Sequence, residues 1–389
     1  MNGKNKTLLI IAIIFVAFNL RSPITGVGSL VSIIKVQLNL SGSAAGIITT
    51  IPLVAFAVVS PFVSKLSQKY GSGHLMFYAL IFMAAGIVIR SFAGTSGLFI
   101  GTAVIGTGIA VGNVMIPSII KSEFPLKIGM ITGIFTTSMS IFAGISSGIS
   151  VPLSKDAGLG WKNALAVWLI LVIVTMLIWI FQWNLQLKGK NEFANDSSEK
   201  NVYKSSIAWY VALYMGIQSL LYYCFVAWLP TILQAKGINV ETAGYYASVY
   251  QIIAIPASFV VPLLAVRREN QKLVTGIISC IYAVSIFMFL IANNTMLIVA
   301  SVLLCGLCSG GCISLAMSFI GLRSSGAGEA AKLSGMAQSL GYTLAAVGPF
   351  IIGSIFDLFH SWNIPLTGLI IMAICLLIVG NKAGEDVTI

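Results

Sequence analysis

One arginine falls inside a long apolar block of this sequence. Arg21 lies a little past halfway along residues 7–30, too deep for its side chain to reach water easily. A charged side chain near the centre of a bilayer costs about 2.5–3.5 kcal/mol on insertion scales. Arginine stays protonated at any working pH, and its planar guanidinium binds oxyanions through two parallel hydrogen bonds. Arg21 is therefore a candidate ligand for an anionic or strongly electronegative solute.

The sequence offers no carboxylate at the depth of Arg21. Its 11 acidic residues all lie in loops, tails or the ends of apolar blocks, with Asp357 the nearest to an exception. Two interpretations stay open. Arg21 contacts a solute, or it satisfies oxygens near Pro23, whose ring leaves the carbonyl of Asn19 without its helical donor. We favour contact with a solute, and Asn19 could serve either role.

Polar and aromatic side chains recur at similar depth in other apolar blocks. Tyr214, Gln218 and Tyr222 share one helical face at i, i+4 and i+8, and Gln338 and Tyr342 repeat this spacing. Buried amides need partners in lipid, so they either line a polar cavity or join helices. We favour the cavity for the amides and tyrosines, and bonds to their own helix for threonines. Besides Arg21, the candidate binding residues are Asn19, Thr25, Asn113, Thr137, Gln218, Tyr222, Tyr250, Gln338 and Tyr342.

Other chemistries find no support in the sequence. It contains no nucleophile–base pair, phosphate-binding loop or paired carboxylates, so we expect no enzyme and no cofactor. Cys305, Cys308 and Cys312 share one helical face, with glycines interleaved and only two histidines in the whole chain. Close helix packing explains these cysteines better than a metal site does. The lack of a buried acid also argues against a carrier of organic cations.

The blocks that carry these residues are long enough to cross a membrane. Of the 389 residues, 58% are hydrophobic and 8% are charged, which excludes a soluble enzyme, a nucleic-acid binder and a disordered protein. A membrane-spanning helix needs about 20 mostly apolar residues. The sequence predicts twelve of them, at about 7–30, 43–64, 74–94, 97–120, 128–152, 163–185, 207–232, 243–265, 272–292, 295–320, 333–356 and 363–381.

The basic residues predict the orientation of these spans. With twelve spans both ends of the chain lie on one side, and of the 22 basic residues only five fall on the other side. The positive-inside rule therefore places both ends in the cytoplasm, and the net charge of +11 is mainly a topology signal rather than a nucleic-acid surface. The five exceptions are Lys35, Arg90, Lys155, Lys162 and Lys236.

One long polar stretch divides the spans six and six. We predict an all-α fold of two six-helix bundles at residues 1–187 and 207–389, joined by a cytoplasmic linker at residues 188–206. Two repeated halves are the usual construction of secondary transporters. The remaining loops are short and leave no room for a soluble domain.

A loop motif makes this interpretation more specific. Residues 64–71 read SKLSQKYG, which resembles the G-x-L-[AS]-D-[RK]-x-G loop of the major facilitator superfamily. The resemblance implies that Lys65, Gln68, Lys69 and Gly71 contribute to a cytoplasmic gate. Gln68 stands where the family pattern has aspartate, so this gate lacks that acid.

Further segments are similar to one branch of that superfamily, the cyanate and 2-nitroimidazole transporters. They include NLRSPITGVG from Asn19, GNVMIPSIIKSEFP from Gly112, IGLRS from Ile320 and EAAKLSGMAQSLGYTLAAVGP from Glu329. The resemblance implies the family fold and transport across a membrane. It leaves the solute open.

We therefore expect a secondary transporter of the inner or plasma membrane that moves a small anionic or polar, electron-poor solute by alternating access, with Arg21 as its central binding charge. One alternative is a drug efflux carrier for neutral or hydrophobic compounds in which Arg21 is structural. A remote one is a membrane sensor or scaffold. The expected partners are the solute and membrane lipid, with no nucleic acid and a monomeric chain. A coupling proton or counter-ion stays open.

Overall fold

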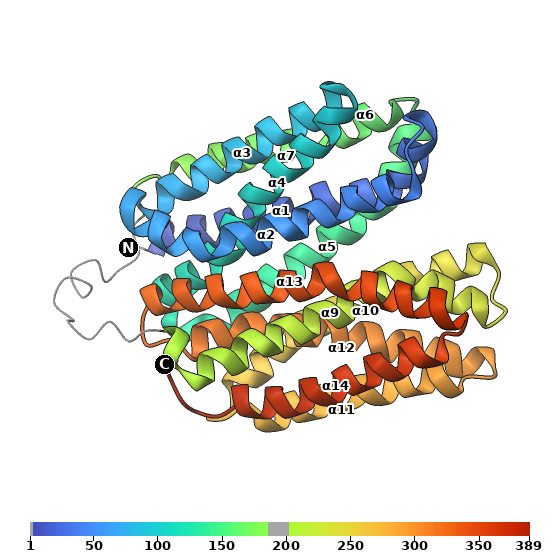
Figure 1. Cartoon of the computed structure of the whole chain (residues 1–389). Coiled ribbons are helices and arrows are strands. Elements are labelled where there is room, and N and C mark those ends of the chain that lie inside the picture. The colour runs from blue at the N-terminus through green and yellow to red at the C-terminus, as the bar shows by residue number, and fades with distance from the viewer. Residues whose placement is uncertain (1–2, 186–201) are drawn as a thin grey trace. The chain divides into compact units, whose positions relative to one another are not determined.

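The computed structural model describes residues 3–185 and 202–389, and the secondary-structure elements within these ranges are helices (Figure 1). Within these ranges twelve segments are long and apolar enough to cross a membrane, as the sequence predicts. Most of the predicted linker, residues 186–201, lies outside the described residues. The helices before it are α1 (Gly3–Gln37), α2 (Gly42–Tyr70), α3 (Ser72–Phe92), α4 (Gly94–Glu123), η1 (Pro125–Lys127), α5 (Ile128–Lys155), α6 (Gly160–Ala166) and α7 (Trp168–Ile180).

The helices after the linker continue the same pattern of long apolar segments. The sixth candidate span joins α6 and α7, while each span after the linker is a single helix. These helices are η2 (Val202–Lys204), α9 (Ser206–Ala235), α10 (Val240–Val266), α11 (Lys272–Ile291), α12 (Thr295–Leu322), α13 (Ala327–Phe359) and α14 (Asn363–Ala383).

Polar side chains fix where several helices begin. Ser41 accepts a 3.1 Å hydrogen bond from the backbone N–H of Ala44 at the start of α2. Asn239 and Asn294 accept 2.8 Å bonds from backbone N–H groups in the first turns of α10 and α12. Each bond satisfies one of the N–H groups that a helix leaves without an internal partner.

The helices pack into two compact units. Unit 1 comprises Met1–Pro125, Ile141–Glu199 and Gly326–Gly335, and unit 2 comprises Leu126–Ser140, Lys200–Ser325 and Met336–Ile389. The first part of α5 therefore packs with unit 2, and the first turns of α13 pack with unit 1. The boundaries predicted from the sequence follow chain order instead and remain a prediction.

Glycines allow helix pairs inside each unit to approach closely. In unit 1 a Cβ at Gly101 of α4 would lie 2.6 Å from the carbonyl oxygen of Gly86 of α3. In unit 2 a Cβ at Gly306 or Gly310 of α12 would overlap with a carbonyl oxygen of α10, at Tyr250 or Ala254. Small residues at such crossings let backbones meet, and for α12 this agrees with the close packing expected around its cysteines and interleaved glycines.

Candidate functional site

Unit 1 carries Arg21 half-buried on α1, with Asn19 two residues before it in the apolar span. The side chain of Asn19 is buried and joins α1 to α7. Its Nδ2 donates to the hydroxyl oxygen of Thr175 at 2.6 Å and to the carbonyl oxygen of Phe15 at 2.8 Å. The amide nitrogen is thus used inside the unit, which favours the structural role of Asn19 over the binding role.

Two further helices hold α1 just after Arg21. The hydroxyl of Ser146 on α5 donates to the carbonyl oxygen of Ser22 at 2.7 Å. On α3, Nη1 of Arg90 donates to the carbonyl oxygen of Pro23 at 2.6 Å. Together with the Asn19 contact, these bonds anchor α1 on both sides of Arg21, at a point where proline removes one of the helix's own hydrogen bonds.

The other candidates of unit 1 flank this segment. Thr25 donates to the carbonyl oxygen of Arg21 at 3.1 Å, so its hydroxyl serves its own helix, as the sequence predicts for threonines. Asn113 is buried on α4. A Cβ at its neighbour Gly112 would lie 2.5 Å from a methyl carbon of Leu20, so α4 passes close to α1 beside Arg21.

The described acidic side chains lie away from the middles of the spans. Glu123 ends α4, Glu241 and Glu329 lie in the first turns of α10 and α13, and Asp357 lies near the end of α13. Asp357 is exposed. Among residues 3–185 and 202–389, the acids therefore lie closer to the ends of their helices than Arg21 does.

Unit 2 carries the remaining candidates, of which Gln218 turns toward its own helix. Its Nε2 donates to the carbonyl oxygen of Met215 at 3.1 Å and to the hydroxyl oxygen of Ser219 at 2.8 Å, and both belong to α9. The side chain is 2% exposed. This geometry favours a packing role for Gln218 over the cavity that we expected from its spacing.

Tyr222 forms a polar and aromatic junction between α9 and α10. Its hydroxyl donates to Oε1 of Gln251 at 3.1 Å. Its ring stacks on that of Tyr250, with ring centroids 6.5 Å apart. The ring centroids of Tyr250 and Phe225 are 6.1 Å apart. Tyr222 is half-buried whereas Tyr250 is buried. The structure thus brings the sequence candidates Tyr222 and Tyr250 together and adds Gln251.

Gln338 and Tyr342 are both buried on α13. Nε2 of Gln338 lies 3.5 Å from the sulfur of Met317 on α12. A Cβ at Gly216 of α9 would lie 2.7 Å from a methyl carbon of Leu344, so α13 runs close to α9 in this part of unit 2. The last candidate, Thr137 on α5, is half-buried in the same unit.

The gate candidates form the turn between α2 and α3. A single residue, Gly71, ends one helix and begins the next with φ of 85°, and its N–H donates to the carbonyl oxygen of Ser67 at 2.9 Å. Glycine suits this left-handed backbone because it has no Cβ. Lys65, Gln68 and Lys69 are exposed around the turn. The tight turn therefore leaves these three side chains exposed at the junction of α2 and α3.

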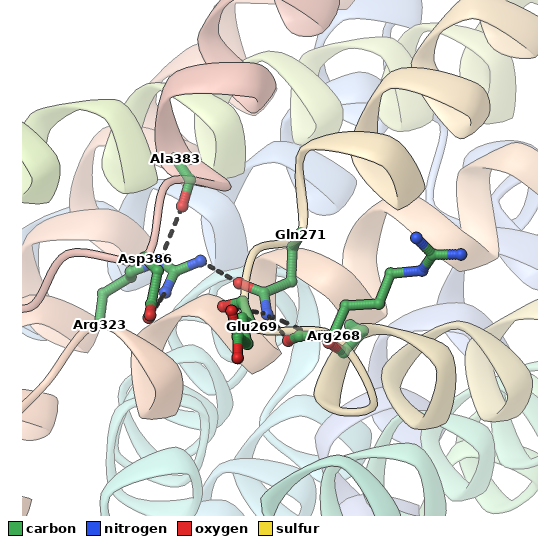
Figure 2. A network of polar contacts seen from close by, with 7 residues as sticks. Arg268, Glu269, Gln271, Arg323, Ala383 and Asp386 are labelled. Carbon is green, nitrogen blue, oxygen red and sulfur yellow. Dashed lines mark hydrogen bonds and ion pairs between the residues drawn. The ribbon is translucent and has the colours of Figure 1, made fainter.

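A polar network around Arg323 closes one end of unit 2 (Figure 2). Arg323 follows α12 and is 2% exposed. Its Nε donates to the carbonyl oxygen of Ala383 at 2.9 Å, Nη2 donates to Oε1 of Gln271, and Nη1 lies 3.8 Å from Asp386. Burial lowers the pKa of Arg323 to about 10, an effect that Asp386 opposes, so the side chain is protonated at neutral pH.

The residues after α14 complete this network. Gln271 donates its backbone N–H to Gly384 at 2.9 Å, and Ile389 donates its N–H to the carbonyl oxygen of Arg323 at 3.0 Å. Glu385 lies 3.2 Å from both Lys272 and Lys382. Residues 384–389 therefore tie the turn before α11 to the end of α12.

Arg90 and Arg323 were not among the binding or gate residues predicted from the sequence. Arg90 entered that prediction as one of the five opposing charges, and Arg323 as part of the IGLRS segment. A signal for Arg90 was present, because it falls inside the predicted span 74–94 and not in a loop. Arg323 had no such signal, since its burial depends on residues 384–389 folding back over it.

The described residues hold no group of three histidine, cysteine or acidic side chains that could bind a metal ion. Cys305, Cys308 and Cys312 are buried and free of disulfides. Cys305 accepts a 3.2 Å hydrogen bond from Ser285 of α11. These thiols pack between helices of unit 2, in agreement with the sequence interpretation.

Comparison with known proteins assigns the family. Residues 8–349 match the model of the Major Facilitator Superfamily. The chain is 42% identical to the uncharacterised transporter YycB of Bacillus subtilis (strain 168), covering 97% of this chain and 94% of that protein. It is 36% identical to the 2-nitroimidazole transporter of Escherichia coli (strain K12), covering 99% and 98%.

More distant similarity agrees with this assignment. The cyanate transport protein CynX of Escherichia coli (strain K12) is 22% identical, with 89% of each chain covered. Among solved structures, the proton:xylose symporter XylE superposes with a TM-score of 0.81 over 97% of this chain and 95% of that one, at 11% identity, which supports the fold. The chain therefore belongs to the Major Facilitator Superfamily, as a multi-pass membrane transporter of the branch that includes the 2-nitroimidazole and cyanate transporters.

Proposed function

We propose that this protein is a secondary transporter for small anionic or polar, electron-poor solutes, with Arg21 as the central binding charge. The observation that carries the proposal is the position of Arg21. It is half-buried in a membrane span, and side chains from three other helices hold α1 on either side of it. An α1 segment fixed in this way presents Arg21 to the solute with little loss of backbone freedom, which favours binding.

The chemistry of the solute follows from a guanidinium ligand. Its fork of N–H donors matches a carboxylate, a cyanate-like anion or a nitro group, each of which presents concentrated negative charge. An organic cation would be repelled. A relative that is 36% identical is named a 2-nitroimidazole transporter, and the nitro group of such a solute is an acceptor of this kind.

Unit 2 carries further candidate contacts of its own. Tyr222 and Gln251 carry a hydroxyl and an amide, and Tyr250 adds an aromatic face. Aromatic faces suit a planar, electron-poor ring through offset stacking. We include Asn113, Thr137, Gln338 and Tyr342 as further proposed contacts, whereas the geometry of Asn19, Thr25 and Gln218 favours roles within their own units.

The orientation and cycle complete the proposal. Following the positive-inside rule, the chain lies in an inner or plasma membrane with both ends on the cytoplasmic side. Transport follows the alternating-access mechanism that is general in the family. Lys65, Gln68, Lys69 and Gly71 form part of the cytoplasmic gate, and the chain works as a monomer with lipid around it. Since the described acids lie near helix ends or in loops, a coupling proton would be carried there or by the solute.

A thermal-shift screen of the purified chain tests the solute class. A ligand that binds the native state raises the unfolding temperature by mass action. We expect stabilisation by cyanate or 2-nitroimidazole, and none by matched cations such as tetraethylammonium. Stabilisation by the cation alone would contradict the proposal. Stabilisation by neutral hydrophobic drugs in both wild type and Arg21→Gln would instead support an efflux carrier in which Arg21 is structural.

A further inference from the structure

Arg90 is a buried arginine that the proposed function does not use. It lies in the last turn of α3, and its side chain is 1% exposed. An arginine cannot shed its proton in a protein, so burying it removes a full charge from water at a cost of several kcal/mol. Among the described residues no acid forms an ion pair with it. A group placed at this cost requires a compensating role.

The contact that Arg90 makes is with the backbone of α1. Its Nη1 donates a 2.6 Å hydrogen bond to the carbonyl oxygen of Pro23, whereas Nε and Nη2 have no hydrogen-bond partner among the described residues. Pro23 follows Arg21 by two positions. Hydrogen bonds from a charged donor are roughly twice as strong as neutral ones. The bond therefore acts on the stretch of α1 that carries the proposed binding charge.

The backbone of Arg90 is itself held firmly. A Cβ at Gly101 of α4 would lie 2.7 Å from the Cα of Arg90, so α4 packs directly against it. Gly86, one turn earlier on α3, meets α4 in the same way. The α3–α4 pair is thus a rigid support, and the Arg90 side chain extends that support to α1.

The need for such support comes from the proline. Pro23 has no N–H, so the turn of α1 that contains Arg21 lacks one of its own hydrogen bonds. Helices bend where this bond is lost. Bonds to other helices hold this segment in place: Asn19 donates to Thr175, Ser146 donates to the carbonyl of Ser22, and Arg90 donates to the carbonyl of Pro23. Of these three, Arg90 is the charged one.

We propose that Arg90 is a positioning residue: its hydrogen bond to Pro23 fixes α1 so that Arg21 points into the substrate path. The predicted effect of Arg90 on binding rests on the proposed function. The structural part of the inference, the fixing of α1, stands separately. Loss of the donor should therefore loosen α1 locally and weaken binding through Arg21.

Hydrogen–deuterium exchange on the full chain tests the structural part. In Arg90→Met we expect faster exchange in residues 15–30 of α1, with the helices of unit 2 unchanged. Arg323→Met removes a buried guanidinium elsewhere and serves as the matched control. It should speed exchange near residues 384–389 and leave exchange in α1 unchanged. Unchanged exchange of α1 in Arg90→Met would overturn the inference.

Binding of 2-nitroimidazole and cyanate to variants of Arg90 tests the consequence. Arg90→Met should raise the Kd by on the order of tenfold, equivalent to loss of one charged hydrogen bond. Because Arg21→Gln should itself abolish saturable binding, the Kd of Arg90→Met is compared directly with that of the wild-type chain. Arg90→Lys keeps a charged donor and should recover most of the affinity. A purely structural Arg90 would lower the unfolding temperature and leave the Kd unchanged, contradicting positioning.

The two proposals fail differently in these measurements. If Arg21→Gln leaves the Kd unchanged, or neither probe binds the wild-type chain, the proposed function is wrong, and exchange in α1 still decides whether Arg90 fixes the helix. If Arg21→Gln abolishes binding while Arg90→Met changes neither Kd nor exchange, the proposed function stands and the role of Arg90 is wrong.

Discussion

Asn19 of α1 and Thr175 of α7 are joined by a 2.6 Å hydrogen bond between Nδ2 and Oγ1. The two residues are far apart in sequence and meet two positions before Arg21. Thr175 in turn donates to the carbonyl oxygen of Leu171 at 2.7 Å on its own helix. The bond therefore links the binding segment of α1 to the regular backbone of α7.

Thr175→Val should weaken this link while keeping the side-chain volume. Hydrogen bonds between helices in a membrane contribute about 0.6 kcal/mol on average, so we expect a loss of about 0.5–1 kcal/mol in unfolding free energy. The measurement is reversible unfolding in detergent. Thr367→Val is the matched control, since Thr367 is exposed and bonds to its own helix. Equal effects of both changes would show that the α1–α7 bond contributes nothing specific.

Gly310→Ala should disrupt the packing of α12 on α10. The new Cβ would overlap with the carbonyl oxygen of Ala254, and overpacking of this kind costs about 1–3 kcal/mol or prevents folding. Gly368→Ala is the control, because its Cβ would meet nothing within 4 Å. We expect the control to match or slightly exceed the wild-type unfolding temperature. Tolerance of Gly310→Ala at wild-type stability would contradict the close approach.

Tyr222→Phe should separate the polar from the aromatic contribution at the α9–α10 junction. The change removes the hydrogen bond to Gln251 and keeps the ring near Tyr250. If the hydroxyl orients a polar solute, the Kd for 2-nitroimidazole should rise roughly threefold, the equivalent of about 0.6 kcal/mol. Titration calorimetry provides the measurement. Tyr245→Phe, at an exposed position, should leave the Kd unchanged.

Residues 384–389 should respond to acid. Hydrogen bonds from Lys272 and Lys382 lower the pKa of Glu385 below its usual 4.5, so the folded chain favours the charged carboxylate. The contribution of Glu385 is present above pH 4.5 and is lost as the pH falls through the lowered pKa. We expect hydrogen-exchange protection of residues 384–389, corrected for intrinsic rates, to drop in that acidic range. Glu385→Gln should show the low protection already at pH 7, and a pH-independent wild type would refute the ion pairs.

The fold could be predicted from composition and spacing because lipid imposes a simple rule. Backbone polar groups in a bilayer must be satisfied within helices, so each apolar block of sufficient length becomes a span. Even the packing of α12 through Gly306 and Gly310 followed from the small residues in the sequence. The hydroxyl of Thr25 also bonds to its own helix as predicted.

The directions of individual side chains could not be predicted in this way. Gln218 shares a helical face with Tyr222, yet its amide bonds to Met215 and Ser219 of its own helix. A rotamer decides this outcome, and spacing does not specify rotamers. Arg90 likewise counts as a topology charge in the sequence, whereas its contact with Pro23 depends on where tertiary packing places α3 and α1.

The most direct test of the central claim is the affinity of purified Arg21→Gln for 2-nitroimidazole and cyanate. Glutamine keeps a polar side chain of moderate length and removes the charge and the guanidinium fork. We predict that saturable binding of the probes is lost, while the unfolding temperature without ligand stays near that of the wild type. A Kd equal to that of the wild type for both probes would contradict Arg21 as the binding charge.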